Sequence, residues 1–180
     1  MTTLIERLLS FSRLDAGQLA PKFEDVDLKQ LAEKAILEMS SIASAKKIEV
    51  ILDGEEVGIA ADRELIRLLM TNLLDNAIKY SFAGDCVSMS IRLKDQSAMI
   101  SITDSGIGIK TEDLDSIFDR FFRSDRAEVR DEAGTGLGLS IVRGILDAHG
   151  GAVDVISSLG KGSTFTVSIP VSRGVGAKSS

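Results

Sequence analysis

The sequence is poor in the residues that build disulfides and metal sites. It contains a single cysteine, Cys86, and a single histidine, His149. One cysteine cannot form an internal disulfide and is typical of a protein in a reducing compartment, so we expect a cytoplasmic location. Because there is no CxxC pair and no second histidine, a conventional zinc site is also excluded.

Long apolar runs and excess positive charge are missing as well. Arg, Asp or Asn interrupts the apolar runs every few residues, so none approaches the roughly 18 uninterrupted apolar residues of a membrane span. The first residues lack the pattern of a signal peptide. The formal net charge is −6, which argues against nucleic acid or an anionic membrane as the main partner. A phosphate site here must be local, built from backbone N–H groups and a few cations.

What the sequence does contain is a globular composition, 44% hydrophobic and 27% charged over 180 residues. This favours one domain with an appendage. Helical patterns are found over residues 2–15, 27–45, 62–81 and 138–149, with a short helix capped by Thr111. Alternating patterns predict strands over residues 47–53, 86–93, 97–103, 152–158 and 163–170.

The order of these elements predicts the fold class. Asp27 and Gln30 form a capping box at the start of the second helix. The first strand is expected to turn at residues 54–56, and Asp95-Gln96 to join two later strands. Because the strands come mostly as hairpins between helices, we expect a two-layer α/β sandwich, with a mixed, mostly antiparallel sheet and helices on one face. This is not the strict βαβ alternation of a Rossmann fold.

The two ends of the chain are expected to lie outside this sandwich. Leu4, Leu8 and Phe11 share one face of the first helix, and so wide an apolar stripe needs a partner. The helix either packs on its own domain or is a truncated piece of a helix bundle, and the linker-like GQLAP that follows favours the bundle. We expect a bundle helix over residues 1–16, a linker over 17–26, the main domain over 27–172 and a frayed tail over 173–180.

A polar stripe marks the helix expected over residues 62–81. Asn72, Asn76 and Lys79 fall at i, i+4 and i+7, opposite an apolar side. Two asparagines at this spacing are poor helix formers and need a reason. An amide oxygen can ligate Mg²⁺, and a lysine can meet a phosphate as a point charge. Taken alone, however, such a stripe is more often a solvated face.

Two glycine-rich segments could bring the backbone close to a ligand. Asp104 precedes Gly106 and Gly108, although a tight turn explains this segment sufficiently on its own. In GTGLGLSIV, residues 134–142, three glycines alternate just before a helix, whose free N–H groups form a ready anion site. The Gly160-Lys161 pair does not fit a P-loop, because the first glycine and the Ser/Thr of that motif are missing.

The segment between these motifs is long and charged. Residues 123–137 contain few apolar side chains, and a loop of this length in a compact domain is usually functional or disordered. Phe118, Phe121 and Phe122 stand just before it. They either anchor the root of the loop or simply belong to the core, and both interpretations remain open.

In order and spacing, NLLDNAIKY, DSGIGI, IFDRFFRSD and GTGLGLSIV resemble the N, G1, F and G2 boxes of sensor histidine kinases. All four stand in the family's order, within about residues 25–170. Residues 1–15 resemble the end of the second helix of that family's dimerisation bundle. The resemblance implies a catalytic domain of the fold shared by histidine kinases, gyrase and Hsp90. That domain binds Mg²⁺–ATP and supplies its γ-phosphoryl group.

The same resemblance implies roles for matching residues. Asn76 would hold Mg²⁺ with Asn72 beside it, Lys79 and Tyr80 would contact phosphate or ribose, and Asp104 would accept a hydrogen bond from the adenine amino group. Residues 123–137 would form a lid that is mobile without nucleotide. The remaining nucleotide-facing residues would be Gly106, Gly108, Arg123, Gly134, Thr135, Gly136, Leu137 and Gly138.

The resemblance also implies partners. The family's phosphoacceptor histidine is expected upstream of Met1, so this chain should not phosphorylate itself. His149 stands at a helix end, where a histidine suits the helix dipole, and is expected to be structural. The implied partners are the histidine-bearing bundle of the parent kinase, a response regulator reached through the parent, and a second copy held weakly through residues 1–15. A parent anchored in the bacterial inner membrane is compatible with this arrangement.

Two other functions stay open. ATP-hydrolysing clamps of the gyrase and Hsp90 type carry a glutamate general base one helical turn before the Mg²⁺ asparagine. Here that position is Asn72, whose amide cannot take a proton from water. A nucleotide-binding module that regulates a partner without transferring phosphate is the second alternative.

Overall fold

The computed structural model describes residues 20–125 and 134–171. The predicted bundle helix with Leu4, Leu8 and Phe11, and the predicted tail over residues 173–180, lie outside these ranges. In chain order the elements are β1 (Glu24–Asp27), α2 (Leu28–Ala45), β2 (Glu49–Gly54), β3 (Gly58–Ala61), α3 (Arg63–Tyr80), β4 (Cys86–Lys94), β5 (Ser97–Asp104), the 3₁₀ helix η1 (Thr111–Asp113), α5 (Gly138–His149), β6 (Ala152–Ser158) and β7 (Gly162–Pro170).

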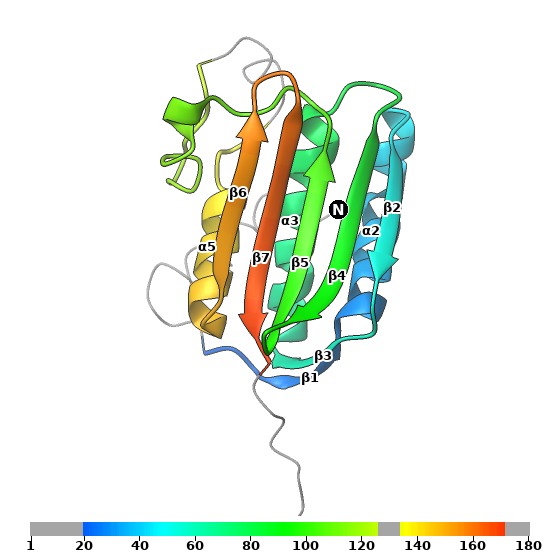
Figure 1. The fold of residues 1–180 in the computed structure, drawn as a ribbon, viewed down its shortest axis with the longest axis vertical. Coiled ribbons are helices and arrows are strands. Elements are labelled where there is room, and N and C mark those ends of the chain that lie inside the picture. The colour runs from blue at the N-terminus through cyan, green and yellow to red at the C-terminus, as the bar shows by residue number, and fades with distance from the viewer. Residues whose placement is uncertain (1–19, 126–133, 172–180) are drawn as a thin grey trace, which may run out of the picture.

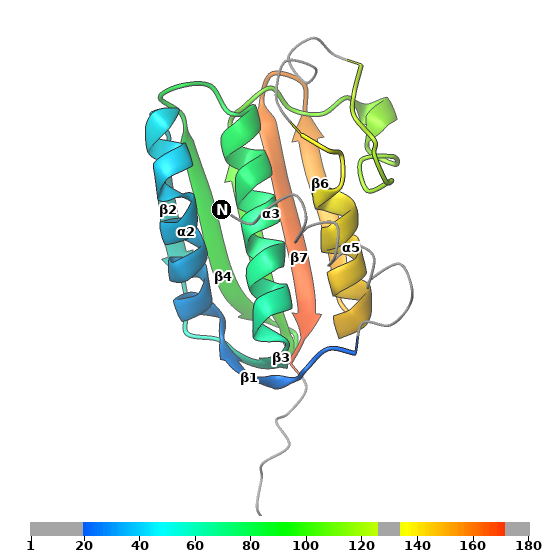
Figure 2. The same ribbon diagram turned by 180° about the vertical axis from the view of Figure 1, so that it is seen from behind.

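The main layer is a five-stranded sheet in the order β2-β4-β5-β7-β6. Strands β2 and β4 pair in parallel, and the other neighbours pair antiparallel. Figures 1 and 2 show helices α2, α3 and α5 on one face of this sheet, with α3 between the other two. The predicted two-layer sandwich with a mixed, mostly antiparallel sheet is therefore confirmed.

Strand alternation decides which face the helices cover. In β5, and in β4 as far as Ile91, every second side chain is buried, including Met89, Ile91 and Ile100, and these pack beneath the helices. The intervening side chains face away from the helices and are mostly hydroxyl-bearing. Across this open face Ser101 and Thr166 are hydrogen-bonded at 3.0 Å. The core thus lies in a single layer between sheet and helices.

Carboxylate caps begin the two long helices, and the cap at Asp27 was predicted. Asp27 accepts from the backbone N–H of Gln30 at 3.1 Å and from its side-chain amide at 3.0 Å. Asp62 accepts from the N–H groups of Glu64 and Leu65, each at 3.1 Å. The expectation for Thr111 was wrong, because Thr111 is itself the first residue of η1. No side-chain cap bond is found at the start of η1 among the described residues.

Two strand pairings were not predicted. Strand β2 ends at Gly54, where the turn over residues 54–56 was expected, but it pairs in parallel with β4, the strand that follows helix α3. Strand β3 pairs with β1 in a separate two-stranded sheet. Strand β1 also overlaps the end of the predicted linker over residues 17–26. Its Val26 is only 1% exposed, so burial of this side chain ties the strand to the domain.

Within residues 20–125 and 134–171, we find no helix with the length and apolarity needed to cross a membrane.

Candidate functional site

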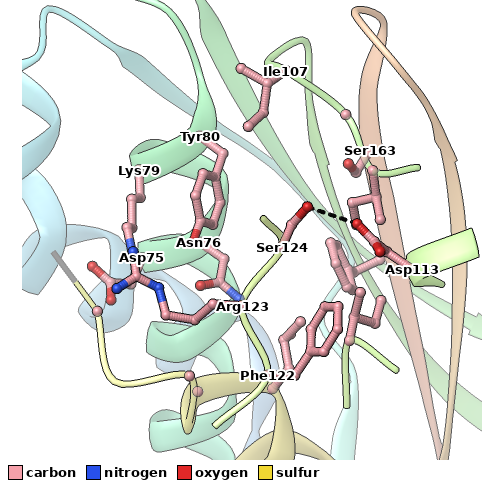
Figure 3. Close-up of a pocket in the computed structure, with 18 of the residues that line it drawn as sticks. Asp75, Asn76, Lys79, Tyr80, Ile107, Asp113, Phe122, Arg123, Ser124 and Ser163 are labelled. Atoms are coloured by element: carbon pink, nitrogen blue, oxygen red, sulfur yellow. Dashed lines mark hydrogen bonds between the residues drawn. The ribbon is translucent and has the colours of Figure 1, made fainter. Parts of the chain in front are cut away.

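A cavity of about 170 Å³ opens between α3, the loop after β5, the start of α5 and the start of β7. Figure 3 shows the α3 side chains on one side of it, with Asp113, Phe122 and Ser163 on the other. Of the predicted site residues, Asn72, Gly106 and Leu137 do not line the cavity. Those that line it are Asn76, Lys79, Tyr80, Asp104, Gly108, Arg123, Gly134, Thr135, Gly136 and Gly138.

Helix α3 carries the polar stripe into this cavity. The side chains of Asn76, Lys79 and Tyr80 are half-buried, and the Lys79 ammonium lies 4.8 Å from the centre of the Tyr80 ring. Lys46, at the end of α2, donates a hydrogen bond to the carbonyl oxygen of Lys79. Asn76 and Lys79 of the stripe therefore line a pocket, and Asn72 is buried, so the solvated-face interpretation is wrong.

Asn72 precedes Asn76 by one turn of α3 and is more deeply buried. It is 2% exposed, and its Nδ2 donates to the carbonyl oxygen of Leu68 at 2.8 Å. A methyl group added to Gly138 would lie 3.2 Å from Asn72 Oδ1 and 4.0 Å from Asn76 Oδ1. Glycine at position 138 therefore lets the first turn of α5 approach both asparagines closely.

One end of the cavity is formed by a buried carboxylate. Asp104 ends strand β5, is 7% exposed, and accepts from the backbone N–H of Gly106 at 2.9 Å. Burial raises the pKa of Asp104 above its ordinary value. Hydrogen bonds from the backbone N–H groups of Gly106 and Ser163 oppose this rise, whereas the negative charge of Asp85 adds to it. The result is a desolvated acceptor held in one orientation.

The loop after Asp104 is clamped against the end of α3. The N–H of Ile107 donates to the carbonyl oxygen of Tyr80 at 3.1 Å. A methyl group on Gly106 would lie 2.0 Å from that same oxygen. Because this contact is with backbone, a side chain at position 106 cannot be accommodated by a simple rotamer change. The glycine is therefore required by close packing.

The β6–β7 hairpin clamps the loop from the other side. Gly108 has φ +64°, and a methyl group there would lie 2.0 Å from the carbonyl oxygen of Ser158. Gly162 has φ +86°, and a methyl group there would lie 2.0 Å from the carbonyl oxygen of Asp104. Gly162 was not among the predicted site residues. Its position just before an alternating strand was the available signal.

The other end of the cavity is formed by the glycine-rich segment before α5. A methyl group on Gly134 would lie 2.5 Å from the Nζ of Lys79, so the lysine ammonium reaches this segment. Gly136 has φ +71°, and its carbonyl oxygen accepts from the N–H of Phe121 at 3.1 Å. Of the predicted lid over residues 123–137, residues 126–133 lie outside the described ranges.

The three phenylalanines before that segment have different environments. Phe118 and Phe122 are half-buried against the core, and Phe122 also lines the cavity. Phe121 has φ +60° and is 64% exposed, so it does not belong to the core. Beside them, Ser124 Oγ donates to Asp113 Oδ2 at 2.8 Å (Figure 3). The core interpretation therefore holds for Phe118 and Phe122, which pack against the core, but not for Phe121, which stands exposed at the root of the loop.

His149 is remote from the cavity and fully bonded. Its Nε2 accepts from the backbone N–H of Asp62 at 3.0 Å, and its Nδ1 lies 2.8 Å from the carbonyl oxygen of Ile145. Because Nε2 accepts a hydrogen bond, Nδ1 is the ring nitrogen that donates to Ile145. His149 ties the end of α5 to the start of α3, which agrees with a structural role. These two bonds hold the end of α5 in place.

Comparison with known proteins gives consistent similarities. Residues 61–173 match the family described as histidine kinase-, DNA gyrase B-, and HSP90-like ATPase. The chain is 38% identical over 168 residues to the sensor-like histidine kinase SenX3 of Mycobacterium tuberculosis. It is 33% identical over 171 residues to the sensor protein SrrB of Staphylococcus aureus. These alignments cover 93% and 94% of the chain but only 41% and 29% of the relatives, so the chain spans less than half of their length.

Solved structures agree with the fold. The histidine kinase AdeS of Acinetobacter baumannii superposes with a TM-score of 0.77 at 30% identity, covering 93% of this chain and 77% of that one. Full-length ShkA, solved in complex with AMPPNP, superposes with a TM-score of 0.82 at 30% identity. That superposition covers 93% of this chain and 35% of ShkA.

Proposed function

The chain belongs to the histidine kinase-, DNA gyrase B- and HSP90-like ATPase family, and on this premise we propose that it binds Mg²⁺–ATP and donates the γ-phosphoryl group to a histidine on a partner bundle. The observation that carries the proposal is one cavity with two unlike ends. A buried acceptor, Asp104, lies at one end, and the Lys79 ammonium lies against glycine-rich backbone at the other. A nucleotide has the matching asymmetry, with a base at one end and phosphates at the other.

At the base end, Asp104 would accept from the exocyclic amino group of adenine. Its carboxylate is already held by two backbone N–H groups and cannot turn away. Apolar side chains of Ile107, Ile109 and Phe165 line the same cavity and suit the faces of a purine ring. Guanine would instead place its carbonyl oxygen, a hydrogen-bond acceptor, against the Asp104 carboxylate, which is also an acceptor.

At the phosphate end, Lys79 and the N–H groups at the start of α5 would meet negative charge, and Arg123, which also lines the cavity, would supply a further positive charge. Gly134 and Gly138 leave the space that side chains would fill. Asn76, whose amide oxygen faces this space, would hold Mg²⁺, which neutralises phosphate charge when bound. Asn72 is too deeply buried to line the cavity, and we propose that it supports the first turn of α5.

The residues that line the cavity suit phosphoryl transfer better than hydrolysis. Transfer depends mostly on positioning and charge neutralisation, which Lys79, Arg123 and the α5 N–H groups can supply. Hydrolysis by a clamp-type ATPase requires a general base for water, and the position one turn before Asn76 holds the buried amide of Asn72. Intrinsic ATP hydrolysis should therefore be far slower than about one turnover per second.

We propose that the phosphoacceptor comes from another polypeptide segment. His149 cannot serve, because both of its ring nitrogens are bonded and it is 9% exposed. The partner would be the histidine-bearing dimerisation bundle of a parent kinase, with a response regulator acting downstream. One relative is named a sensor-like histidine kinase and the other a sensor protein, which supports this assignment. The division into a bundle remnant over residues 1–16, a linker and a catalytic domain over 27–172 remains part of the proposal.

Binding and transfer can be tested separately. Titration calorimetry should show ATP binding that Asp104→Asn weakens by about 1–3 kcal/mol, and GTP should bind more weakly than ATP. With γ-labelled ATP, the chain alone should stay unlabelled, whereas an added histidine-bearing bundle should acquire acid-labile label. Asn76→Ala should abolish that label. Label on the isolated chain, or rapid phosphate release that Asn76→Ala abolishes, would contradict the proposal. ATP binding without transfer to the bundle would favour a regulatory module.

A further inference from the structure

A serine behind the base end of the cavity has an unusually complete set of hydrogen bonds. Ser157, in strand β6, does not line the cavity. Its Oγ lies 2.9 Å from each of three partners: the backbone nitrogen of Ile109, the carbonyl oxygen of Gly162 and the Oγ of Ser163. These partners belong to the loop after β5 and to the start of β7, so a single hydroxyl joins both walls of the base end.

The chemistry of the three partners assigns every proton. The N–H of Ile109 can only donate, and the carbonyl oxygen of Gly162 can only accept. The single proton of Ser157 must therefore point to Gly162, since otherwise two oxygen lone pairs would face each other at 2.9 Å. It follows that the Ser163 hydroxyl donates its own proton to Ser157. Ser157 then holds one donated and two accepted bonds.

This assignment fixes the polarity of Ser163, which does line the cavity. Ser163 lies in the wall of the cavity (Figure 3). It is 7% exposed, so solvent offers its hydroxyl little alternative to the bond with Ser157. With its proton committed, Ser163 Oγ retains only acceptor lone pairs. The neighbouring Asp104 carboxylate is also an acceptor, and Ser163 and Asp104 are paired residues of strands β7 and β5.

We propose that Ser157 is a positioning residue for base selection, which fixes the Ser163 hydroxyl as an acceptor so that the base end favours a purine with an exocyclic amine over one with a carbonyl. The inference rests on the proposed binding of ATP. It adds that selectivity depends on a residue that never touches the base. Without Ser157, the Ser163 proton is released and can turn toward a carbonyl oxygen.

The test is the ratio of ATP to GTP affinity, measured by titration calorimetry on the whole chain. Ser157→Ala should lower this ratio on the order of tenfold, the value of about one hydrogen bond. Ser157→Thr keeps the hydroxyl and should preserve the ratio. Ser158→Ala, at the exposed neighbouring position, is the matched control. Thermal unfolding of each variant identifies loss of fold.

A double-mutant cycle shows whether Ser157 acts by orienting the Ser163 hydroxyl or only by stabilising the surrounding loop. If Ser157 acts through Ser163, then Ser157→Ala should change the ratio little further in a Ser163→Ala background. An unchanged ratio in folded Ser157→Ala, or full additivity with Ser163→Ala, would overturn the inference and leave ATP binding intact. Failure of the wild-type chain to bind ATP would instead overturn the proposed function, and the inference with it. If Ser157→Ala does not fold, a lowered ratio in Ser157→Thr would overturn the inference, and a preserved ratio would support it.

Discussion

The base end and the phosphate end of the cavity both depend on glycine, but their glycines meet different neighbours. At the base end, methyl groups on Gly106 and Gly108 would lie 2.0 Å from backbone carbonyl oxygens. At the phosphate end, a methyl group on Gly134 would meet the terminal nitrogen of a flexible lysine, at 2.5 Å. Backbone cannot yield without moving an element, whereas a lysine can change rotamer. The base end is thus built for fixed shape, and the phosphate end for adjustment to its ligand.

The largest expected effect comes from filling the base end. Gly106→Ala should lower the free energy of unfolding by about 3 kcal/mol or more, because the new methyl group overlaps the Tyr80 carbonyl and α3 must shift. Gly58→Ala is the control, because no described atom lies within 4 Å of a methyl group there. Urea denaturation of both variants measures the difference. Equal stabilities would mean that the loop after β5 is not rigidly clamped.

The second effect is on affinity at the phosphate end. Lys79→Met should weaken ATP binding by about 1.5–3 kcal/mol, the value of a hydrogen bond to a charged group, while stability changes little. Lys94→Met, at an exposed position on β4, controls for the loss of one positive charge. Titration calorimetry against ATP and ADP would locate the lost contact. A similar loss in both lysine variants would show that long-range charge, and not Lys79, accounts for binding.

A smaller effect tests the desolvation at the base end. Burial raises the pKa of Asp104, so its ionised form is less favourable in the folded chain than in the unfolded chain. This penalty is absent at pH values below the unfolded pKa and grows as the pH rises through the folded value. Asp104→Asn should therefore gain stability relative to wild type as the pH is raised from about 4 to 7, although it binds ATP less well. Denaturation midpoints that stay parallel across this range would show that Asp104 is not desolvated.

The smallest effect is expected from a substitution of glycine at the phosphate end. Gly134→Ala should change the free energy of unfolding by no more than about 0.5 kcal/mol, because Lys79 can move aside. ATP affinity should fall only a few-fold, since the displaced ammonium still reaches a phosphate. Denaturation and calorimetry on the same preparation measure both quantities. A loss of stability comparable to that of Gly106→Ala would remove the distinction between the two ends.

The fold was predictable from sequence wherever one local pattern decides the outcome. Alternation defined β4, β5 and β7 because one side of each strand is buried and the other is not. The pairing of β1 with β3 was not predictable, since each strand has only four residues and its partner is remote. The parallel pairing of β2 with β4 joins strands that stand on either side of β3 and α3 in the chain, so no local pattern indicates it.

The residues of the candidate site likewise divide into those that a local sequence pattern predicts and those that only the folded structure brings together. The stripe on α3 and the acidic residue before two glycines are local patterns, and they pointed to Asn76, Lys79 and Asp104, which meet at one cavity. Ser157 and Ser163 carry no local signal. Their importance appears only when the β6–β7 hairpin packs against the loop after β5, because a serine in a strand is otherwise an ordinary surface residue.

The register of β5 against β7 also has a kinetic consequence. Asp104 pairs with Ser163 at the end of this ladder, and 58 residues separate them in sequence. Closing so long a loop costs chain entropy before the pairing returns any stability, which slows folding. The base end cannot exist until that closure is complete, so a partly folded chain should have no nucleotide affinity. Nucleotide binding would then act on global unfolding, protecting the whole domain from proteolysis and not merely the residues around the cavity.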